Sequence, residues 1–143
     1  MGAETSSTHM IFFIVATALA VVVSALLSTQ VYDIANTVRD RGASLGDNIA
    51  TDIAIINDPG QVPNNPVIIY VKNTGQRTID HTTISVIIDG VHRTHTVTLL
   101  GGAAAWQHGD VAEFSITLTL ASGDHRVRVV TANGIEDDLR FRI

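Results

Sequence analysis

The pattern of hydrophobic and polar positions divides the chain into an apolar run, a stretch with helical spacing and a long region of alternation. The apolar run extends from Met10 to Leu27, carries no charged residue, and has only Thr17 and Ser24 as hydroxyl side chains. A helix rises about 1.5 Å per residue, so this run spans roughly 27 Å, close to the hydrocarbon thickness of a bilayer. The run therefore predicts a transmembrane helix over residues 10–30.

A buried core helix is the first alternative for this run, but a soluble helix of this length normally has a polar face. A cleaved secretory signal needs a basic segment before the apolar run, and residues 1–9 contain no Lys or Arg. A type IV pilin-like processing signal, which also needs a basic residue, is missing too. We therefore expect a short tail over residues 1–9 and an anchor that stays uncleaved. The expected anchor side chains are Met10, Ile11, Phe12, Phe13, Ile14, Val15, Leu19, Val22, Val23, Leu26 and Leu27.

Apolar or small residues then recur at steps of three and four, namely at Val31, Ile34, Ala35, Val38, Gly42, Leu45 and Ile49. This spacing draws a narrow stripe on a helix, so the membrane helix is predicted to continue as a stalk over residues 31–48, weakened at Gly42 and Gly46. The stripe is either a seam for another helix or for the domain, or part of a solvated stalk. Val31, Val38 and Leu45 are its candidate assembly residues.

From Ile49 the period changes to two, which is typical of half-buried strands. About seven strands are predicted, over residues 49–56, 67–72, 84–88, 91–99, 111–120, 126–129 and 139–143. The second of these is apolar on both faces, which places it inside a sheet, and a turn at Asn73-Thr74-Gly75 is expected to end it. In the fifth, Phe114, Ile116, Leu118 and Leu120 are expected to face inward. Asp89-Gly90 and Asn133-Gly134 are hairpin signals. We therefore predict a mainly β protein in which one long N-terminal transmembrane helix precedes an immunoglobulin-like antiparallel β-sandwich over residues 49–143. A small barrel is the alternative.

Composition narrows the function further. About a hundred residues follow the anchor, enough for one small domain with its own core. The net charge is −5 with nine basic residues, so no basic face indicates a nucleic-acid partner. The chain has no cysteine, which excludes disulfides and thiolate metal sites.

The sequence contains no catalytic constellation. Of the six histidines, His92 and His95 are three residues apart in a predicted strand, so their side chains are expected on opposite faces. Gly101-Gly102 lacks the lysine and the helix of a phosphate-binding loop. We therefore expect no enzyme activity, no metal, no cofactor and no small-molecule substrate.

Exposed sheet edges are the usual route by which sandwiches associate. Two predicted segments hold apolar residues beside a hairpin, residues 91–99 and 139–143. They add four residues to the candidate assembly interface, Val91, Val97, Leu139 and Phe141.

A set of short motifs, spread over nearly the whole chain, resembles the FlaG-type stator proteins of the archaeal swimming filament, the archaellum. The motifs are Thr8–Phe13, Asp52-Ile53, Asn57–Gly60, Val71–Gly75, Gln107–Val111, Ser122–Val127 and Phe141–Ile143. The resemblance implies a helix in the cytoplasmic membrane and a β-sandwich beneath the S-layer. It also implies self-association, pairing with a FlaF-type stator protein and, through that protein, bracing against S-layer protein.

Three alternatives stay open from the sequence. The chain is similar in layout to FlaF-type proteins, to archaellin or pilin subunits, and to unrelated membrane-tethered binding modules or envelope enzymes. The charge bias opposes the implied orientation slightly, because Arg39 and Arg41 follow the anchor while no Lys or Arg precedes it. We nevertheless expect the sandwich on the outer side of the membrane.

Overall fold

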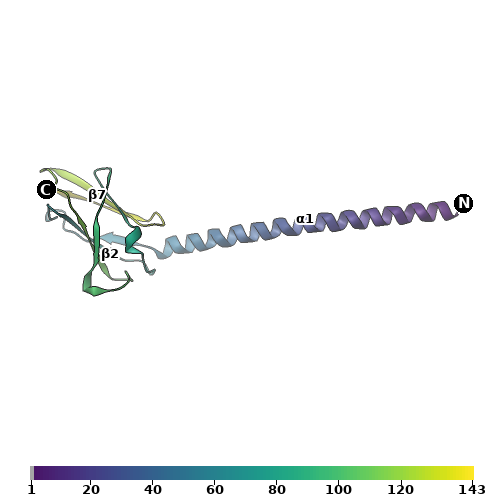
Figure 1. Cartoon of the computed structure of the whole chain (residues 1–143), viewed down its shortest axis with the longest axis horizontal. Helices are drawn as coiled ribbons and strands as arrows, with labels where there is room; N and C mark the ends of the chain where they lie inside the picture. Colours follow the sequence, from purple (N-terminus) through teal and green to yellow (C-terminus); the bar gives the residue numbers. More distant parts are fainter. Residues whose placement is uncertain (1) are drawn as a thin grey trace. The chain divides into compact units, whose positions relative to one another are not determined.

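The computed structural model describes residues 2–143, with side-chain surroundings from Ser6 onward. It divides the chain into two compact units, Met1–Ala43 and Ser44–Ile143. A single helix, α1 (Gly2–Ala50), accounts for the described part of the first unit and ends inside the second; Figure 1 shows it as one unbroken ribbon. Within the described residues, α1 is long and apolar enough to cross a membrane.

The bounds of α1 differ from those expected. The helix already includes Gly2 to His9, where a tail was expected, and it continues through Gly42 and Gly46 to Ala50. A glycine costs a helix about 1 kcal/mol, which neighbouring bonds can offset. The amide of Thr51 bonds the carbonyl of Asp47 at 3.1 Å and holds the last turn. The first strand therefore starts later than expected, and Ile49, predicted to alternate within it, is helical and 85% exposed.

The second unit is a sandwich of two four-stranded antiparallel sheets, which confirms the predicted architecture. The first sheet has the order β1 (Ile53–Ile55), β2 (Val67–Asn73), β6 (Val111–Ile116), β5 (Thr96–Leu99). The second has the order β4 (Val91–Arg93), β3 (Ser85–Ile88), β7 (Asp124–Val130), β8 (Glu136–Arg142). Two short 3-10 helices, η1 (His81–Thr83) and η2 (Leu100–Gly102), lie in the connections.

The predicted strand over residues 91–99 is two strands, β4 and β5, that belong to different sheets. The face that carries Val91, Val97 and Leu99 is interrupted by the polar residues Arg93 and His95. At this interruption the chain leaves the second sheet and enters the first. The premise that His92 and His95 share one strand is therefore wrong.

The predicted strand over residues 111–120 ends early, at Ile116. Ile116 pairs with Val67, the first residue of β2, and Asn65, two residues before Val67, has a φ of 66° and is not extended, so the β2–β6 ladder ends here. The side chain of Asn64 replaces a strand partner beyond this point, since it accepts from the amide of Leu120 at 2.9 Å and donates to its carbonyl at 3.0 Å.

The core lies between the two sheets. Trp106, Phe114, Ile69 and Ile88 are among its largest fully buried side chains, and the inward alternation predicted for Phe114 and Ile116 is confirmed. β2 is an inner strand of its sheet, as its apolar faces predicted. Asp89-Gly90 forms the predicted two-residue hairpin, with φ of 51° and 80°.

Candidate functional site

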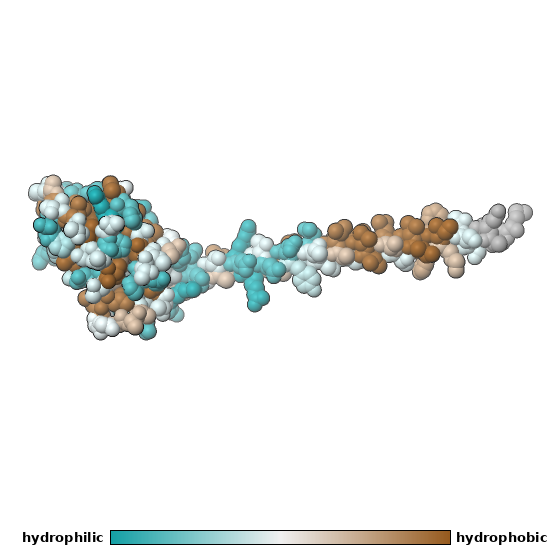
Figure 2. Space-filling view, viewed as in Figure 1, coloured by the Kyte–Doolittle hydropathy of each residue, from teal (hydrophilic) through white to brown (hydrophobic). Residues whose placement is uncertain are grey.

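The first candidate surface is the apolar part of α1. All eleven expected anchor residues are exposed, from 46% at Val23 to 71% at Phe13. Figure 2 shows the apolar segment of α1 in brown, followed by more polar residues. The hydroxyl of Thr17 donates to the carbonyl of Phe13 at 2.9 Å, and Ser28 does the same to Ser24. The hydroxyls of Thr17 and Ser28 thus have acceptors within the helix, an arrangement compatible with a lipid environment.

The second feature is the loop after β2, which holds the end of α1. The carbonyl of Ala50 accepts from the amides of Gln76 at 2.8 Å and Arg77 at 3.1 Å. The carbonyl of Asp52 accepts from the amides of Thr74 at 3.0 Å and Gly75 at 2.9 Å. These contacts lie within the second unit, and those to Ala50 satisfy a carbonyl that the end of α1 leaves without a partner.

Side-chain contacts also connect the loop after β2 to the end of α1. Arg77 forms an ion pair with Asp47, and the hydroxyl of Thr74 donates to the carboxylate of Asp52 at 2.7 Å. Gly75 is required by its close approach to the backbone, because a Cβ there would lie 2.4 Å from the nitrogen of Asp52. The turn predicted at Asn73-Thr74-Gly75 is thus also the attachment point of the helix end.

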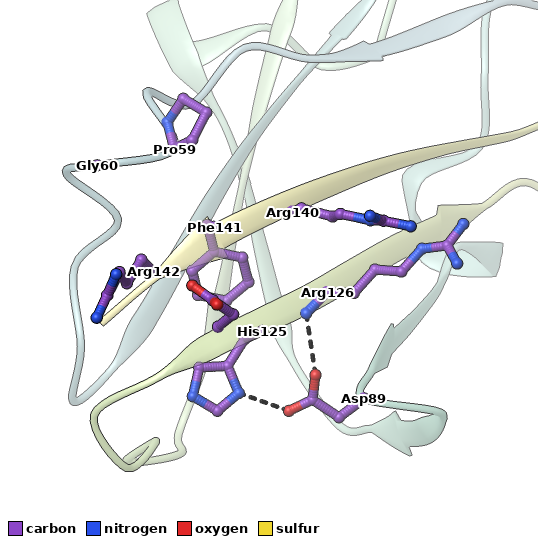
Figure 3. Close-up of a pocket in the computed structure, with 9 residues that line it drawn as sticks. Pro59, Gly60, Asp89, His125, Arg126, Arg140, Phe141 and Arg142 are labelled. Carbon is purple, nitrogen blue, oxygen red and sulfur yellow. Dashed lines mark hydrogen bonds and ion pairs between the residues drawn. The ribbon is translucent and has the colours of Figure 1, made fainter.

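The third feature is an open depression of about 650 Å³, lined by the loop residues Pro59 and Gly60 and by side chains of β7 and β8, among them Arg140 and Phe141 (Figure 3). The guanidinium of Arg126 donates to the carboxylate of Asp138 through Nε at 3.0 Å and Nη2 at 2.9 Å. This pairing lowers the pKa of Asp138 and raises that of Arg126. Both side chains are exposed, so the pair contributes little to stability.

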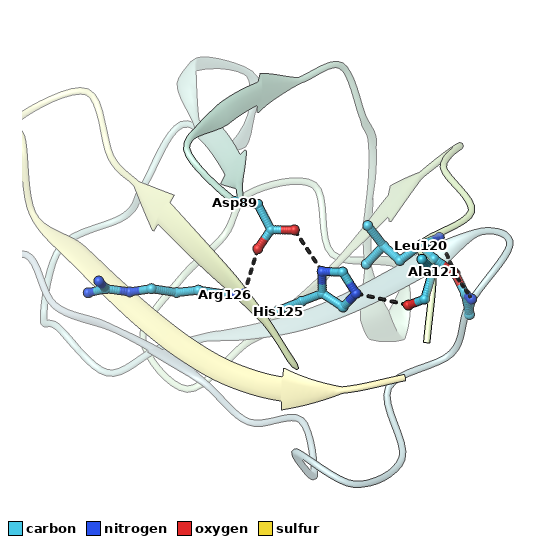
Figure 4. Close-up of polar contacts among 6 residues, drawn as sticks. Asp89, Leu120, Ala121, His125 and Arg126 are labelled. Atoms are coloured by element: carbon cyan, nitrogen blue, oxygen red, sulfur yellow. Dashed lines mark hydrogen bonds and ion pairs between the residues drawn. The ribbon is translucent and has the colours of Figure 1, made fainter. Parts of the chain in front are cut away.

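His125, on the edge of this depression, has an acceptor at both ring nitrogens (Figure 4). Its Nδ1 lies 2.7 Å from the carboxylate of Asp89 and its Nε2 lies 2.9 Å from the carbonyl of Ala121. The hydrogen bond to Ala121 and the one to Asp89 raise the pKa of His125 above its ordinary value of 6.5. The bond from the Arg126 amide, followed by that from His125, lowers the pKa of Asp89.

This arrangement makes His125 a structural clasp. An imidazole can donate from both nitrogens only when it is protonated, so the two acceptors favour the charged form of His125. The clasp joins the β3–β4 turn, the start of β7 and the segment before it. Among the described residues, no group of three or more His, Asp and Glu side chains gathers in a metal-ligating arrangement.

The candidate assembly residues differ in how exposed they are in the structure. Val31, Val38 and Leu45 are exposed on α1, and Val91 is 48% exposed on β4. Val97 and Leu139 are half-buried against the core. Phe141 is only 3% exposed and belongs to the core, so we withdraw it from the candidate interface.

The sheet edges are not equally accessible. The β1 and β8 edges lie together, since the amide of Ile55 donates to Asp137 at 2.7 Å, and Arg142 donates its amide to the carbonyl of Pro59 at 3.0 Å. The edge of β5 carries no charged residue, no proline and no neighbouring strand on its outer side. β5 is therefore the edge most open to pairing.

The sequence did not single out the His125 clasp or the contact at Gly75. Asp89 was expected only as a turn residue and His125 as one of six histidines. Their contact depends on pairing between β3 and β7, in which Ile88 lies opposite Val127. No local motif signals such a contact.

Comparison with known proteins adds the family. The model of the archaeal-type flagellin family matches residues 3–141. The chain is 30% identical over 148 aligned positions to the "Putative flagella-related protein G" of Methanocaldococcus jannaschii, covering 96% of this chain and 95% of that protein. It is 34% identical to the protein of the same description from Methanococcus voltae, over 89% of each chain. It is also similar to the solved "Archaellum periplasmic stator protein FlaG" of Sulfolobus acidocaldarius, with 23% identity and a TM-score of 0.50, over 64% of this chain and 99% of that one.

Proposed function

This chain belongs to the archaeal-type flagellin family, as a FlaG-type archaellum protein, and from that premise we propose that it is a membrane-anchored stator subunit. The family is one of structural archaellum components. In the proposed function, α1 anchors the chain in the cytoplasmic membrane and the sandwich stands outside as a fixed part against which the filament turns. The observation that carries the proposal is an exposed apolar helical segment followed along the chain by a sandwich.

The expected free energy of membrane insertion supports anchoring by α1. Residues 10–27 include eleven Leu, Ile, Phe and Val side chains, each worth about −0.3 to −0.6 kcal/mol for insertion, or roughly −3 to −7 kcal/mol together. An arginine at the centre of the segment costs about 2.5–3.5 kcal/mol. The double variant Leu19→Arg/Val22→Arg should therefore abolish insertion.

The test is alkaline carbonate extraction of membranes that contain the full chain. We expect the parent to stay in the pellet, the double variant to be released, and the control Thr29→Arg, at the end of the segment, to stay in the pellet. Release of the parent would contradict the anchor. A reporter that is active only in the cytoplasm, fused after Ile143, tests the orientation; activity there would contradict an external sandwich.

Self-association through β5 is the second part of the proposal. The β5 edge offers Thr96 and Thr98 as exposed side chains and has unpaired backbone groups along a strand without charged residues. Antiparallel pairing of two β5 strands would satisfy those groups. Val97 lies on this edge strand, whereas Val91 lies on β4 of the other sheet.

A proline substitution in β5 tests whether this edge carries the self-association. Val97→Pro should abolish dimers of the full chain in detergent, as measured by light scattering with the detergent mass subtracted, because the amide of Val97 faces away from β6 and proline cannot donate to a second strand. Thr117→Pro, in a segment outside the strands, is the control for folding. Unchanged dimers in a folded Val97→Pro variant would exclude β5.

Pairing with a FlaF-type protein, which then binds S-layer protein, is the third part, and it is supported by membership in the FlaG-type group. Co-purification of the tagged full chain with the FlaF-type protein from detergent-solubilised membranes tests it. Direct binding to S-layer protein without that partner would instead favour a FlaF-like role for this chain.

An archaellin or pilin-like filament subunit is the second candidate, because the matched family model is described as archaeal-type flagellin. Filament subunits of this kind carry a processed N-terminus. Mass spectrometry of the mature chain distinguishes the two. An N-terminus trimmed to the edge of the apolar run would favour the filament subunit.

A further inference from the structure

The segment of α1 after the apolar run presents a continuous apolar stripe. We define the stalk stripe as Val31, Ile34, Val38, Gly42, Leu45 and Ile49. Its spacing repeats after eleven residues, which gives 3.67 residues per turn and keeps the stripe on one side of a nearly straight helix. Its large side chains are 62–85% exposed. Such a stripe, on a helix outside the membrane, offers a packing surface for a partner helix.

The charged residues of this segment indicate which kind of helix would pack on the stalk stripe. Arg41 follows Val38 by three residues and precedes Leu45 by four, so it lies at one border of the stripe. Arg39 precedes Gly42 by three residues and lies at the other border. Asp33, Asp40 and Asp47 are spaced by seven residues and lie along the opposite side of the helix. The stripe is thus bordered by positive charge only.

We propose that the stalk stripe packs in parallel against a helix of a different membrane-anchored chain, one with apolar residues at the same eleven-residue spacing and Asp or Glu at both borders. The inference rests on the proposed membrane anchoring, which gives both helices the same direction. A second copy fits less well, because in a parallel pair in register the border with Arg41 of one copy faces the border with Arg39 of the other. Like charges in that position repel, whereas acidic borders pair with Arg39 and Arg41.

Binding of defined probes to the full chain in nanodiscs tests the charge preference. Two synthetic twenty-residue helical peptides share an apolar stripe of this spacing and differ only in their border residues, Glu in one and Lys in the other. A third peptide has the chain's own residues 31–50. We expect the Glu peptide to bind about tenfold more tightly than either of the others, since two exposed charge pairs contribute up to about one kcal/mol each.

Matched variants assign that preference to the borders. Arg39→Gln/Arg41→Gln should remove it, while Asn36→Glu/Ala43→Glu, which lowers the net charge by the same two units on the far side of the helix, should keep it. Equal binding of the Glu and Lys peptides by the parent, or tightest binding of the chain's own peptide, would overturn the proposal.

Cross-linking in native membranes gives an independent readout. The chain has no cysteine, so Val38→Cys introduces a single thiol in the stripe. With a thiol-to-amine cross-linker, we expect a product whose second chain, identified by mass spectrometry, carries an apolar stripe with acidic borders. A homodimer, or a partner without acidic borders, would overturn the proposal. Carbonate extraction of the same membranes reports on anchoring separately, so failure of the anchor and failure of the helix pairing are distinguishable.

Discussion

Gly75 is the residue at which one methyl group should have the largest effect on the junction between α1 and the sandwich. In Gly75→Ala, the new Cβ would lie 2.4 Å from the nitrogen of Asp52, 2.6 Å from the carbonyl oxygen of Ala50 and 3.0 Å from the carbonyl carbon of Thr51. All three are backbone atoms, so no side chain can rotate away. The loop after β2 or the end of α1 must move.

The distance that the loop must move determines how much stability Gly75→Ala loses. An ordinary van der Waals contact needs at least 3.4 Å, so the loop must withdraw by about 1 Å. The four backbone hydrogen bonds from residues 74–77 to Ala50 and Asp52 are 2.8–3.1 Å long and cannot all survive that movement. Loss of about two of them, at roughly 0.5–1.5 kcal/mol each, and the strain of overpacking give an expected loss of about 2–4 kcal/mol.

Urea unfolding of the full chain in mild detergent measures this loss. Trp106 is the single tryptophan and is fully buried, so its fluorescence reports on the sandwich without interference from α1. Gly60→Ala is the matched control, since the nearest atom to its Cβ would be Asp58 Oδ1 at 3.6 Å. The control should change stability by less than about 0.5 kcal/mol. Equal unfolding midpoints for Gly75→Ala and Gly60→Ala would refute the reasoning.

Three further predictions concern other parts of the molecule. Gly46→Ala, where a Cβ meets nothing within 4 Å, should stabilise the helix by up to about 1 kcal/mol; a lower thermal midpoint by far-ultraviolet circular dichroism would contradict it. Ile88→Ala should cost about 2–5 kcal/mol in the same urea assay, because the side chain is fully buried; a loss below about 1 kcal/mol would place it outside the core. His125→Gln should destabilise most between about pH 4 and 6.5. The raised pKa of His125 makes its stabilisation complete below 6.5 and lost as the pH rises through the folded-state pKa, and the lowered pKa of Asp89 removes it in strong acid. Urea midpoints of parent and variant, compared from pH 3 to 10, measure this, and a difference that grows at alkaline pH would contradict the clasp.

Several features of the fold are determined by residues that are neighbours in the sequence. Alternation placed Phe114 and Ile116 in the core, and the apolar faces of Val67 to Lys72 predicted an inner strand. Asp89-Gly90 predicted its hairpin because both residues tolerate positive φ. These features depend on a few neighbouring residues, so one sequence carries enough information to predict them.

Other features depend on which segments meet. The end of α1 at Ala50 could not be predicted from Gly42 and Gly46, because bonds from the loop after β2 hold the last turn. The segment over residues 91–99 is divided between two sheets because its first half pairs with β3 and its second half pairs with β6. Phe141 was a candidate contact residue, but packing between the sheets buries it.

The sequence by itself determined the apolar helix, the helical stripe that follows it, the antiparallel β-sandwich and most of its turns. Each of these follows from the period of apolar residues and from the backbone preferences of Gly, Pro and Asx residues. Only the tertiary structure decided that the Gly75 loop holds the helix end, that His125 bonds Asp89 and Ala121, and that β5 is the open edge. The physical reason is that these contacts, apart from the one between His125 and Ala121, join residues 22 to 36 positions apart or depend on the order of strands, which the period of a sequence does not specify.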